Sequence, residues 1–501
     1  MSADAYPELL RRARDIAVAQ SCAAVLGWDQ QTYLPPAGAD FRGEQLAFLA
    51  ALAHQKLTDP TYGDLLARAA DAPGAVDPAG VAAANVRELR RSYDRATKLP
   101  ARLVEELARV TAAAHLAWAD ARRTDTLATF RPHLERIVAL KREEAAAVGF
   151  VGHPYDALLD EYEPGTTAAD VRAVFANLTA GLVPLIQQAT AVAPGDNVLA
   201  RDFPVERQKL FAESAAAAIG FDFRAGRLDT AAHPFCSGFG PGDCRLTTRY
   251  NPGLFHEAFF GVLHEAGHGL YEQNLPAAAF GTPAGMYCSL GIHESQSRLW
   301  ENQVGRGRPF WRHFYPRLKQ AFPGTLDDVP PDDFLAAINR VRPSFIRVEA
   351  DEATYNLHII LRFELELGLI SGDLTVADLP GAWNERFQAL FGLAVPSDRE
   401  GCLQDIHWSF GGLGYFPTYT LGNLYAAQFM AAACRSLGGD AIDESFARGD
   451  FSSLLGWLTE HIYRHGRRYP AGELCRRATG AELASGAFLE YLQGKVCLVA
   501  G

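Results

Sequence analysis

Apolar residues recur every three or four positions along most of the chain, which is the spacing of helices with one buried face. The clearest stretches lie in the first 220 residues, where prolines or short polar turns separate segments rich in alanine, leucine, arginine and glutamate. They predict helices over Val81 to Lys98, Arg102 to Arg123 and Leu127 to Val148. Their charged faces are expected to lie in solvent, so we interpret residues 1–220 as a helical lobe.

The pattern changes between about residues 229 and 250. Residues 233–242 contain proline and three glycines and favour a loop, and the alternation from Asp243 to Tyr250 predicts a short strand. A second short strand is expected at Phe345 to Val348, before a long helix from about Glu352 to Gly368. The sequence therefore predicts a mainly α protein with a small antiparallel β-sheet, whose free edge could hydrogen-bond an extended peptide.

Another apolar stretch with helical spacing, residues 254–263, leads directly into His264-Glu265-Ala266-Gly267-His268. Asn251-Pro252-Gly253 is expected to begin this helix, because proline is tolerated at the first helical position. Residues four apart lie on one helix face, so His264 and His268 can hold a single metal ion about 2.0 to 2.1 Å from their ring nitrogens. Glu265 is expected to reach a water molecule beside the ion and to act as general base. This pattern indicates a zinc peptidase.

A catalytic zinc ion needs a third protein ligand and leaves the fourth place open. The extended motif with a third histidine is absent, since Tyr271 and Asn274 stand at the positions of its glycine and histidine. We predict Glu294 as the third ligand, on a helical segment from Gly291 to Glu301. A turn rich in glycine and proline over residues 276–285 would fold this segment back against the first helix.

Two other glutamates compete for this role. Glu272 lies on the same predicted helix as the histidines, four residues beyond His268, from where reaching back to the ion is harder. Glu301 lies two turns past Glu294 and is expected to pair with a cation. Gly267 is a poor helix former, and its expected use is to permit the close approach of another segment.

Composition limits the remaining classes of function. The 501 residues are 48% hydrophobic, which allows a large core, and no linker divides them, so we expect one catalytic domain with lobes at 1–220 and 221–501. The 47 basic and 59 acidic side chains are mixed along the chain and carry a formal charge of -12. Because no basic stripe is present, nucleic acid is not expected as a partner.

The location of the protein is also expected from the sequence. Residues 1–7 lack a basic region followed by an apolar run, and no stretch reaches the length and apolarity of a membrane span. The eight cysteines show no C-x-x-C spacing, so they form neither a disulfide framework nor a zinc–cysteine site. We therefore expect a cytoplasmic protein with reduced thiols and no membrane partner.

Arginine and aromatic residues outside the metal motif suggest how a peptide could be held. Arg347 and Arg245 each lie on a predicted strand, and an arginine can hold both oxygens of a terminal carboxylate. A structural salt bridge is the alternative for each. His407, Tyr415 and Tyr419 lie in a glycine-punctuated aromatic segment and could donate to a developing oxyanion, unless that segment is only a packed loop.

Taken together, these segments resemble the carboxypeptidase Taq family of metallocarboxypeptidases. The matching motifs, in chain order, are His233-Pro234-Phe235 (HPF), Asp243, Arg245 and Thr247 (DxRxT), His264 to His268 (HExxH), His293 to Gln296 (HESQ), Ile346-Arg347 with Ala350-Asp351 (IRxxAD), and Gly401 to Trp408 (GxxQDxHW). The early Trp28-Asp29-Gln30 also looks similar to the family, so the resemblance covers nearly the whole chain.

The resemblance implies a gluzincin-like helical fold with a deep substrate groove, zinc or cobalt as the metal, and a homodimer. It also implies release of single residues from peptide carboxyl termini, with broad side-chain preference and proline disfavoured. Carried over by position, the resemblance implies that the metal is held by His264, His268 and Glu294 and that Glu265 is the general base. It also implies that Arg347 anchors the terminal carboxylate of the peptide. His407 and Tyr419 are the implied contacts to the substrate or to the oxyanion, and Tyr415 is an alternative to them.

The sequence leaves two alternative hypotheses of function open. An endo-acting oligopeptidase would share the metal set but would lack an anchor for a terminal carboxylate. A helical scaffold with a structural metal is a reading from a different class, and it fits less well because structural zinc sites usually have four protein ligands.

Overall fold

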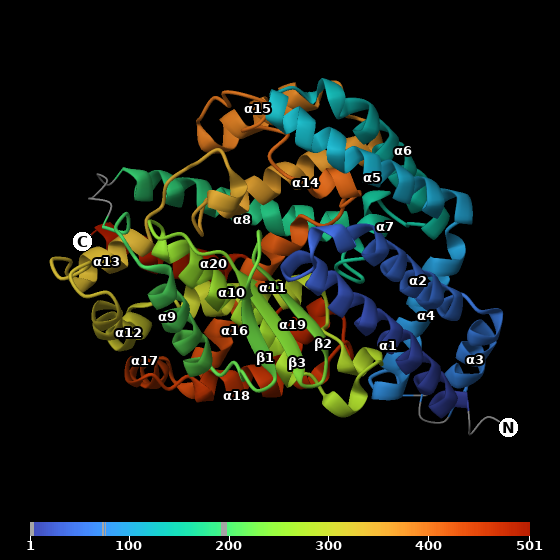
Figure 1. Ribbon diagram of the computed structural model, residues 1–501, viewed down its shortest axis with the longest axis horizontal. Helices are drawn as coiled ribbons and strands as arrows, with labels where there is room; N and C mark the ends of the chain where they lie inside the picture. Colours follow the sequence, from blue (N-terminus) through green and yellow to red (C-terminus); the bar gives the residue numbers. More distant parts are fainter. Residues whose placement is uncertain (1–4, 73–74, 76, 192–197, 501) are drawn as a thin grey trace. The chain divides into compact units, whose positions relative to one another are not determined.

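The computed structural model describes residues 5–72, 75, 77–191 and 198–500, and these form helices and one three-stranded sheet (Figure 1). They group into two compact units, the first from residues 1–96, 195–338 and 425–482, and the second from 97–194, 339–424 and 483–501. The expected lobes at 1–220 and 221–501 do not follow these units, because each unit draws on segments far apart in the chain. That the whole chain is one catalytic domain stays a prediction.

The first unit holds the sheet. Its elements are α1 Ala5–Thr32, α2 Ala39–Leu57, α3 Pro60–Ala70, α4 Val81–Lys98, α9 Val205–Ala218, β1 Gly226–Thr230, β2 Phe235–Gly240, β3 Asp243–Thr248, α10 Phe255–Asn274, α11 Leu290–Arg298, α12 Arg308–Ala321, α13 Pro331–Ile338, α17 Gly439–Arg448, α18 Ser452–His461 and α19 Ala471–Thr479. The second unit has α5 Ala101–Thr124, α6 Arg131–Val148, α7 Tyr155–Leu159, α8 Ala168–Thr190, α14 Tyr355–Ser371, α15 Leu379–Phe391 and α20 Gly486–Ala500. Helix α16, Pro417–Leu437, passes from the second unit into the first.

The long helices follow the apolar spacing of the sequence closely. Helix α4 spans Val81–Lys98 as predicted, and α5 extends the predicted Arg102 to Arg123 by one residue at each end. The segment predicted as one helix over Leu127 to Val148 divides into a 3-10 turn, Leu127–Thr129, and α6. Proline in the first turn of α6 explains the division, because it lacks the N–H that a continuous helix would use.

The sheet is mixed, and the prediction of an antiparallel sheet was wrong in part. The strand order is β1-β3-β2, with β3 antiparallel to β2 and parallel to β1. The segment predicted as a loop contains β2, and β1 was not predicted. Neither strand shows a clear alternation of apolar and polar residues. Leu228 is the one buried apolar residue of β1, and Phe239 is the one buried apolar residue of β2.

Helix α10 packs against the sheet and carries the metal motif (Figure 1). It begins at Phe255, two residues later than the predicted Asn251-Pro252-Gly253 start, because the Asn251 side chain accepts a hydrogen bond from the Gly253 N–H and holds these residues in a turn. The amino-terminal part of α10 is anchored by a cluster of aromatic rings in stacked, tilted and edge-on contacts, which are Phe203, Phe211, Phe255, Phe259 and Phe322. The motif therefore lies on a rigid, buried helix.

The strand predicted at Phe345 to Val348 does not form. Ile346 is extended, but Arg347–Glu349 is a 3-10 turn. The Arg347 N–H donates to the Gln404 side chain at 2.8 Å instead of to a strand. The long helix that follows, α14, begins at Tyr355 rather than at Glu352, because the Asp351 side chain accepts the N–H groups of Ala353 and Thr354 before the first turn.

One helix contradicts the expectation that no stretch is apolar enough to cross a membrane. Helix α8 passes that test by length and composition. Its residues Val171, Phe175, Leu178 and Leu182 are buried within the second unit, and the Phe175 ring meets that of Phe363 edge on. A core helix satisfies the same test, so α8 is weak evidence for a membrane segment.

Candidate functional site

Helices α10 and α11 approach each other at Gly267. A Cβ atom at this glycine would lie 2.5 Å from the carbonyl oxygen of Gln296 and 2.6 Å from Cα of Ser297, so only glycine fits. The expectation that Gly267 permits a close approach is confirmed. This contact places Glu294 on α11 beside the two histidines of α10.

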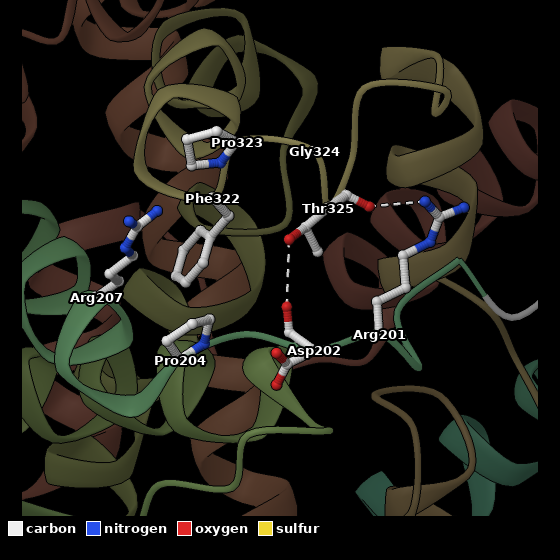
Figure 2. Close-up of a pocket in the computed structure, with 8 residues that line it drawn as sticks. All are labelled: Arg201, Asp202, Pro204, Arg207, Phe322, Pro323, Gly324 and Thr325. Carbon is white, nitrogen blue, oxygen red and sulfur yellow. Dashed lines mark hydrogen bonds between the residues drawn. The ribbon is translucent and has the colours of Figure 1, made fainter.

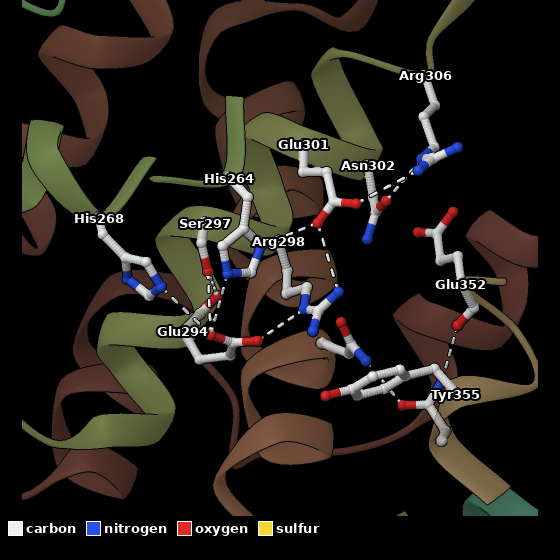
Figure 3. Close-up of polar contacts among 12 residues, drawn as sticks. His264, His268, Glu294, Ser297, Arg298, Glu301, Asn302, Arg306, Glu352 and Tyr355 are labelled. Atoms are coloured by element: carbon white, nitrogen blue, oxygen red, sulfur yellow. Dashed lines mark hydrogen bonds and ion pairs between the residues drawn. The ribbon is translucent and has the colours of Figure 1, made fainter. Parts of the chain in front are cut away.

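His264, His268 and Glu294 meet in one cluster (Figure 3). Their ligand atoms all lie within 4.8 Å of one another, and Oε2 of Glu294 lies 3.7 Å from Nε2 of His264 and 3.4 Å from Nε2 of His268. Two ligands that each bind one ion at about 2.0 to 2.1 Å with tetrahedral angles lie roughly 3.3 Å apart. The three side chains therefore fit around a single divalent metal ion.

Glu301 lies behind this cluster. Its Oε2 accepts a hydrogen bond from Nδ1 of His264 at 2.9 Å, which leaves Nε2 as the lone-pair donor that a metal requires. The expected pairing of Glu301 with a cation is confirmed by contacts of 3.4 Å to Arg298 and to Arg306 (Figure 3). Its contact with His264 was not predicted, although its spacing of seven residues from Glu294 was a usable signal.

Glu272, the other competitor, does not join the cluster. Its Oε1 lies 2.9 Å from Nε2 of His293, a member of the HESQ segment. The His293 ring in turn stacks on His268 at 4.5 Å between centroids. Glu272 and His293 therefore support the packing around His268.

The electrostatic field of the cluster favours a cation. Burial alone would raise the pKa of Glu294, but the charges of Arg298 and His264 outweigh it and hold that pKa well below its usual range. Burial lowers the pKa of His268 to about 3, so its ring is neutral and can act as a ligand. Burial would also lower the pKa of His264, but the nearby Glu294 and Glu301 raise it. One anionic carboxylate and two ring nitrogens form a donor set suited to zinc, and the second carboxylate, Glu301, adds negative charge behind it.

Glu265 is buried on the same helix, next to the first histidine. Burial raises its pKa to about 7, although the charge of His264 opposes this shift. A carboxyl group with such a pKa can both accept and return a proton near neutral pH.

The candidate substrate residues of the second unit also come together. Nε and Nη2 of Arg347 lie 2.9 and 2.7 Å from Oδ1 of Asp405, and Nη1 donates to the Tyr355 hydroxyl at 2.8 Å. Arg362 binds the other oxygen of Asp405 through Nε at 2.6 Å. Arg347 is thus part of a buried salt bridge, and two of its five N–H groups lie outside these three bonds. Asp405 is a site residue to which the sequence analysis gave no role.

His407 and the two tyrosines surround this arginine. Nε2 of His407 lies 3.2 Å from the Tyr419 hydroxyl, and the Arg347 guanidinium lies over the Tyr419 ring at 5.3 Å. The Tyr415 ring lies 5.3 Å from that of His407. The expected aromatic segment is therefore packed, and it also presents polar groups beside Arg347.

Glu366 holds this aromatic segment in place. Its buried carboxylate accepts hydrogen bonds from Trp408 Nε1 at 2.8 Å, from the Gly414 N–H at 3.0 Å and from the Tyr155 hydroxyl at 2.6 Å. Burial raises the pKa of Glu366 to about 7. Trp408 and Gly414 of the segment that contains His407 are thereby bound to α14.

Arg245, the other candidate arginine, lies on β3 in the first unit. Its guanidinium pairs with both oxygens of Asp243 at 2.8 Å. It also stacks over the Trp28 ring at 4.5 Å. Asp243 and Arg245 of the DxRxT motif and Trp28 therefore form one structural contact, and a substrate role for Arg245 stays a prediction.

A separate surface pocket of about 600 Å3 lies in the first unit between residues 201–207 and 322–325 (Figure 2). Both of its arginines are engaged by the protein. Arg201 pairs with Asp328 and with the Thr325 carbonyl, and Arg207 donates to the Ala321 carbonyl. None of the predicted site residues lines this pocket, so it is not the candidate active site.

A mainly helical fold with two histidines and a glutamate from adjacent helices defines a metallopeptidase of the H-E-x-x-H class. The family model of the carboxypeptidase Taq (M32) metallopeptidases matches residues 8–496. The chain belongs to this family, and it is therefore a metallocarboxypeptidase, a peptide hydrolase that depends on a divalent metal.

Individual relatives agree with this assignment. The chain is 45% identical over 508 residues to "Thermostable carboxypeptidase 1" of Thermus thermophilus, and the match covers 99% of each. Its structure is similar to that of the M32 carboxypeptidase from Deinococcus radiodurans R1, with a TM-score of 0.95, 42% identity and 99% of each chain covered. It is also similar to Trypanosoma cruzi metallocarboxypeptidase 1, with a TM-score of 0.93 and 36% identity over 98% of this chain and 99% of that one.

Proposed function

We propose that the protein releases single amino acids from the free carboxyl ends of peptides, with zinc as the metal and cobalt as a working substitute. The observation that carries the proposal is the meeting of His264, His268 and Glu294 next to Glu265. This set has three ligands and an adjacent carboxylate, which suits a catalytic ion rather than a structural one. The expected side-chain preference is broad, with proline disfavoured, as the family resemblance implies.

A metal ion bound here would polarise a peptide carbonyl and acidify a water molecule. Glu265 would take the proton of the attacking water and return it to the leaving amine. Its burial supports this role, because burial raises the pKa of Glu265 to about 7. Glu301 would hold the His264 ring in the tautomer that binds metal.

Arg347 would bind the terminal carboxylate of the peptide. Its planar group matches a carboxylate in geometry, and its buried position would strengthen a charge-assisted contact. Asp405 and Tyr355 support the role by holding the guanidinium in one orientation. Tyr419 and His407, and less directly Tyr415, would add polar contacts to the substrate or to the developing oxyanion.

Replacing Arg347 by alanine is expected to lower kcat/KM for peptides with a free carboxylate by about a hundredfold, because a buried charge-assisted contact is lost. Matching peptides with an amidated end should be poor substrates of the wild type and should hardly respond to the change. Kinetics on acid and amide pairs with different last residues would measure both effects, together with metal content.

Arg347→Lys provides the control, because lysine keeps the charge but lacks the planar fork. A melting temperature for each variant reports on the salt bridge with Asp405. An equal loss on acids and amides would assign Arg347 to structure alone, and efficient cleavage of amidated peptides by the wild type would favour the endo-acting oligopeptidase instead.

We also propose that the protein is a homodimer that pairs through α2. This helix has 19 residues, but only Arg42 and Ala53 are buried, and Phe41 and Phe48 are 64% and 68% exposed. Residues seven apart lie on the same face of a helix, so the two rings form one apolar surface. Covering it with a second copy would remove both rings from water.

Changing Phe41 and Phe48 together to aspartate is expected to convert the dimer into a 54.5 kDa monomer. The wild type should sediment at twice that mass, because the apolar surface is available to a second copy. Sedimentation equilibrium measures both states, and Leu116→Asp, an equally exposed apolar site on α5, should leave the dimer intact. A monomeric wild type, or a double variant that stays dimeric, would contradict this interface.

A further inference from the structure

Arg298 occupies a distinctive position at the end of α11, because it binds a carboxylate that is itself in the ligand cluster. Its Nε donates to Oε1 of Glu294 at 2.7 Å, one helical turn away (Figure 3). The other oxygen of Glu294, Oε2, is the one that faces Nε2 of His264 and of His268. The two oxygens of one carboxylate are therefore divided between a cation of the protein and the ligand cluster.

The same guanidinium also contacts the carboxylate behind His264. Nη1 of Arg298 lies 3.4 Å from Oε2 of Glu301, which accepts the hydrogen bond from Nδ1 of His264. The chain changes at Arg298 from an α-helix to a π-helix, Leu299–Val304. Single π-helical turns are frequent at functional sites, and here the turn follows directly after the residue that links Glu294 to Glu301.

A second contact restricts Glu294 further. The Ser297 hydroxyl lies 3.2 Å from Oε2 of Glu294 and donates to the Glu294 backbone carbonyl at 2.7 Å. To present both oxygens to an ion, the carboxylate would have to turn Oε1 away from Arg298. That movement would break a charge-assisted hydrogen bond in a buried place, where such bonds are strongest.

We propose that Arg298 is a positioning residue that keeps Glu294 a one-oxygen ligand and so preserves an open coordination place for the reacting groups. The inference rests on the proposed function, since it requires an ion on His264, His268 and Glu294. It assigns a role to an arginine that touches neither the ion nor the substrate. Outer contacts of this kind orient ligands and decide how many atoms the ion can accept.

Crystal structures of the zinc-loaded wild type and of Arg298→Met would test the proposal directly. In the wild type, Oε1 of Glu294 should lie more than about 3 Å from the zinc ion, and in Arg298→Met it should approach to about 2.2 Å. In solution, the cobalt-loaded variant should show weaker visible absorption than the wild type, because a higher coordination number reduces the intensity of these bands. Arg298→Lys should restore the wild-type distance and spectrum, since it returns a cation to Oε1.

Arg306→Met is the matched control. Arg306 also contacts Glu301 at 3.4 Å, and it binds the Asn302 side chain and the Ile338 carbonyl, whereas Oε1 of Glu294 is held by Arg298, so this variant removes an equal charge and leaves the bond to Oε1 in place. It should leave one oxygen of Glu294 on the ion. If Arg306→Met changed the ligation as Arg298→Met does, net charge and not position would be responsible, and the inference would be wrong.

The remaining outcomes separate this inference from the proposed function. If both oxygens of Glu294 bind zinc in the wild type, the proposed role of Arg298 is wrong, although the metal site stands. The same holds if only one oxygen of Glu294 binds zinc in Arg298→Met. A wild-type crystal with zinc elsewhere and none at His264 and His268 would overturn the proposed function itself. The wild-type structure alone still tests the inference if Arg298→Met does not fold.

Discussion

Removing the metal is expected to abolish peptide hydrolysis while leaving the protein folded. The three candidate ligands lie on α10 and α11, whose packing depends on buried phenylalanines and on the contact at Gly267, not on an ion. A core of this size does not need one ion for folding, unlike a small zinc finger. Activity should vanish in excess chelator and return with zinc or cobalt, while the circular dichroism spectrum stays unchanged.

Two variants test which glutamate is the third ligand of the metal ion. Glu294→Ala should weaken metal binding and lower activity, because it removes one of three ligands. Glu272→Ala is the control, since its carboxylate lies next to His293 and outside the cluster. Full activity in protein shown by metal analysis to be empty would refute the mechanism, and metal loss in Glu272→Ala but not in Glu294→Ala would reverse the assignment of the third ligand.

Replacing Glu265 by glutamine is expected to lower kcat by about a thousandfold without loss of metal. Glutamine has nearly the same shape but cannot accept the proton of the attacking water, and general base catalysis contributes about 10² to 10⁴ in rate. Because Glu265 is buried beside His264 but is not in the ligand cluster, the bound metal should stay near one per chain. Steady-state kinetics with metal analysis on the same sample measures both quantities.

The matched control for this change is Glu272→Gln, which removes another negative charge from the same helix. It should retain most of the activity, because Glu272 lies beside His293 and not beside the ligands. If Glu265→Gln lost its metal together with its activity, Glu265 would support the ligands and another group would have to act as the base.

Local patterns predicted the helical part of the site well. Helix α4 begins and ends where its apolar spacing does, and α10 carries His264 and His268 one turn apart. Such features follow from the period of a single helix, which is a property of consecutive residues. The prediction that Gly267 allows a close approach was confirmed, since a missing side chain within an apolar helix has few other uses.

Local sequence patterns did not predict the contacts between distant segments. Arg347 was expected on a strand, but its backbone N–H binds Gln404 and its side chain binds Asp405, both more than fifty residues away. Strand β1 pairs in parallel with β3 through a register that its own residues do not signal. Short polar segments of this kind take their conformation from the partner they meet, and the partner is not part of the local pattern.

From consecutive residues alone it follows that His264 and His268 lie on one face of a single helix, with Glu265 beside the first of them, because residues four apart align along a helix. The sequence also carried the motifs by which the family is recognised. The packing of α10 and α11 was needed to establish that Glu294 and not Glu272 meets the histidines, and that Glu301 and Arg298 lie behind them. The reason is physical: the helix period sets positions within one element, whereas the packing of α11 on α10 at Gly267 sets positions between elements.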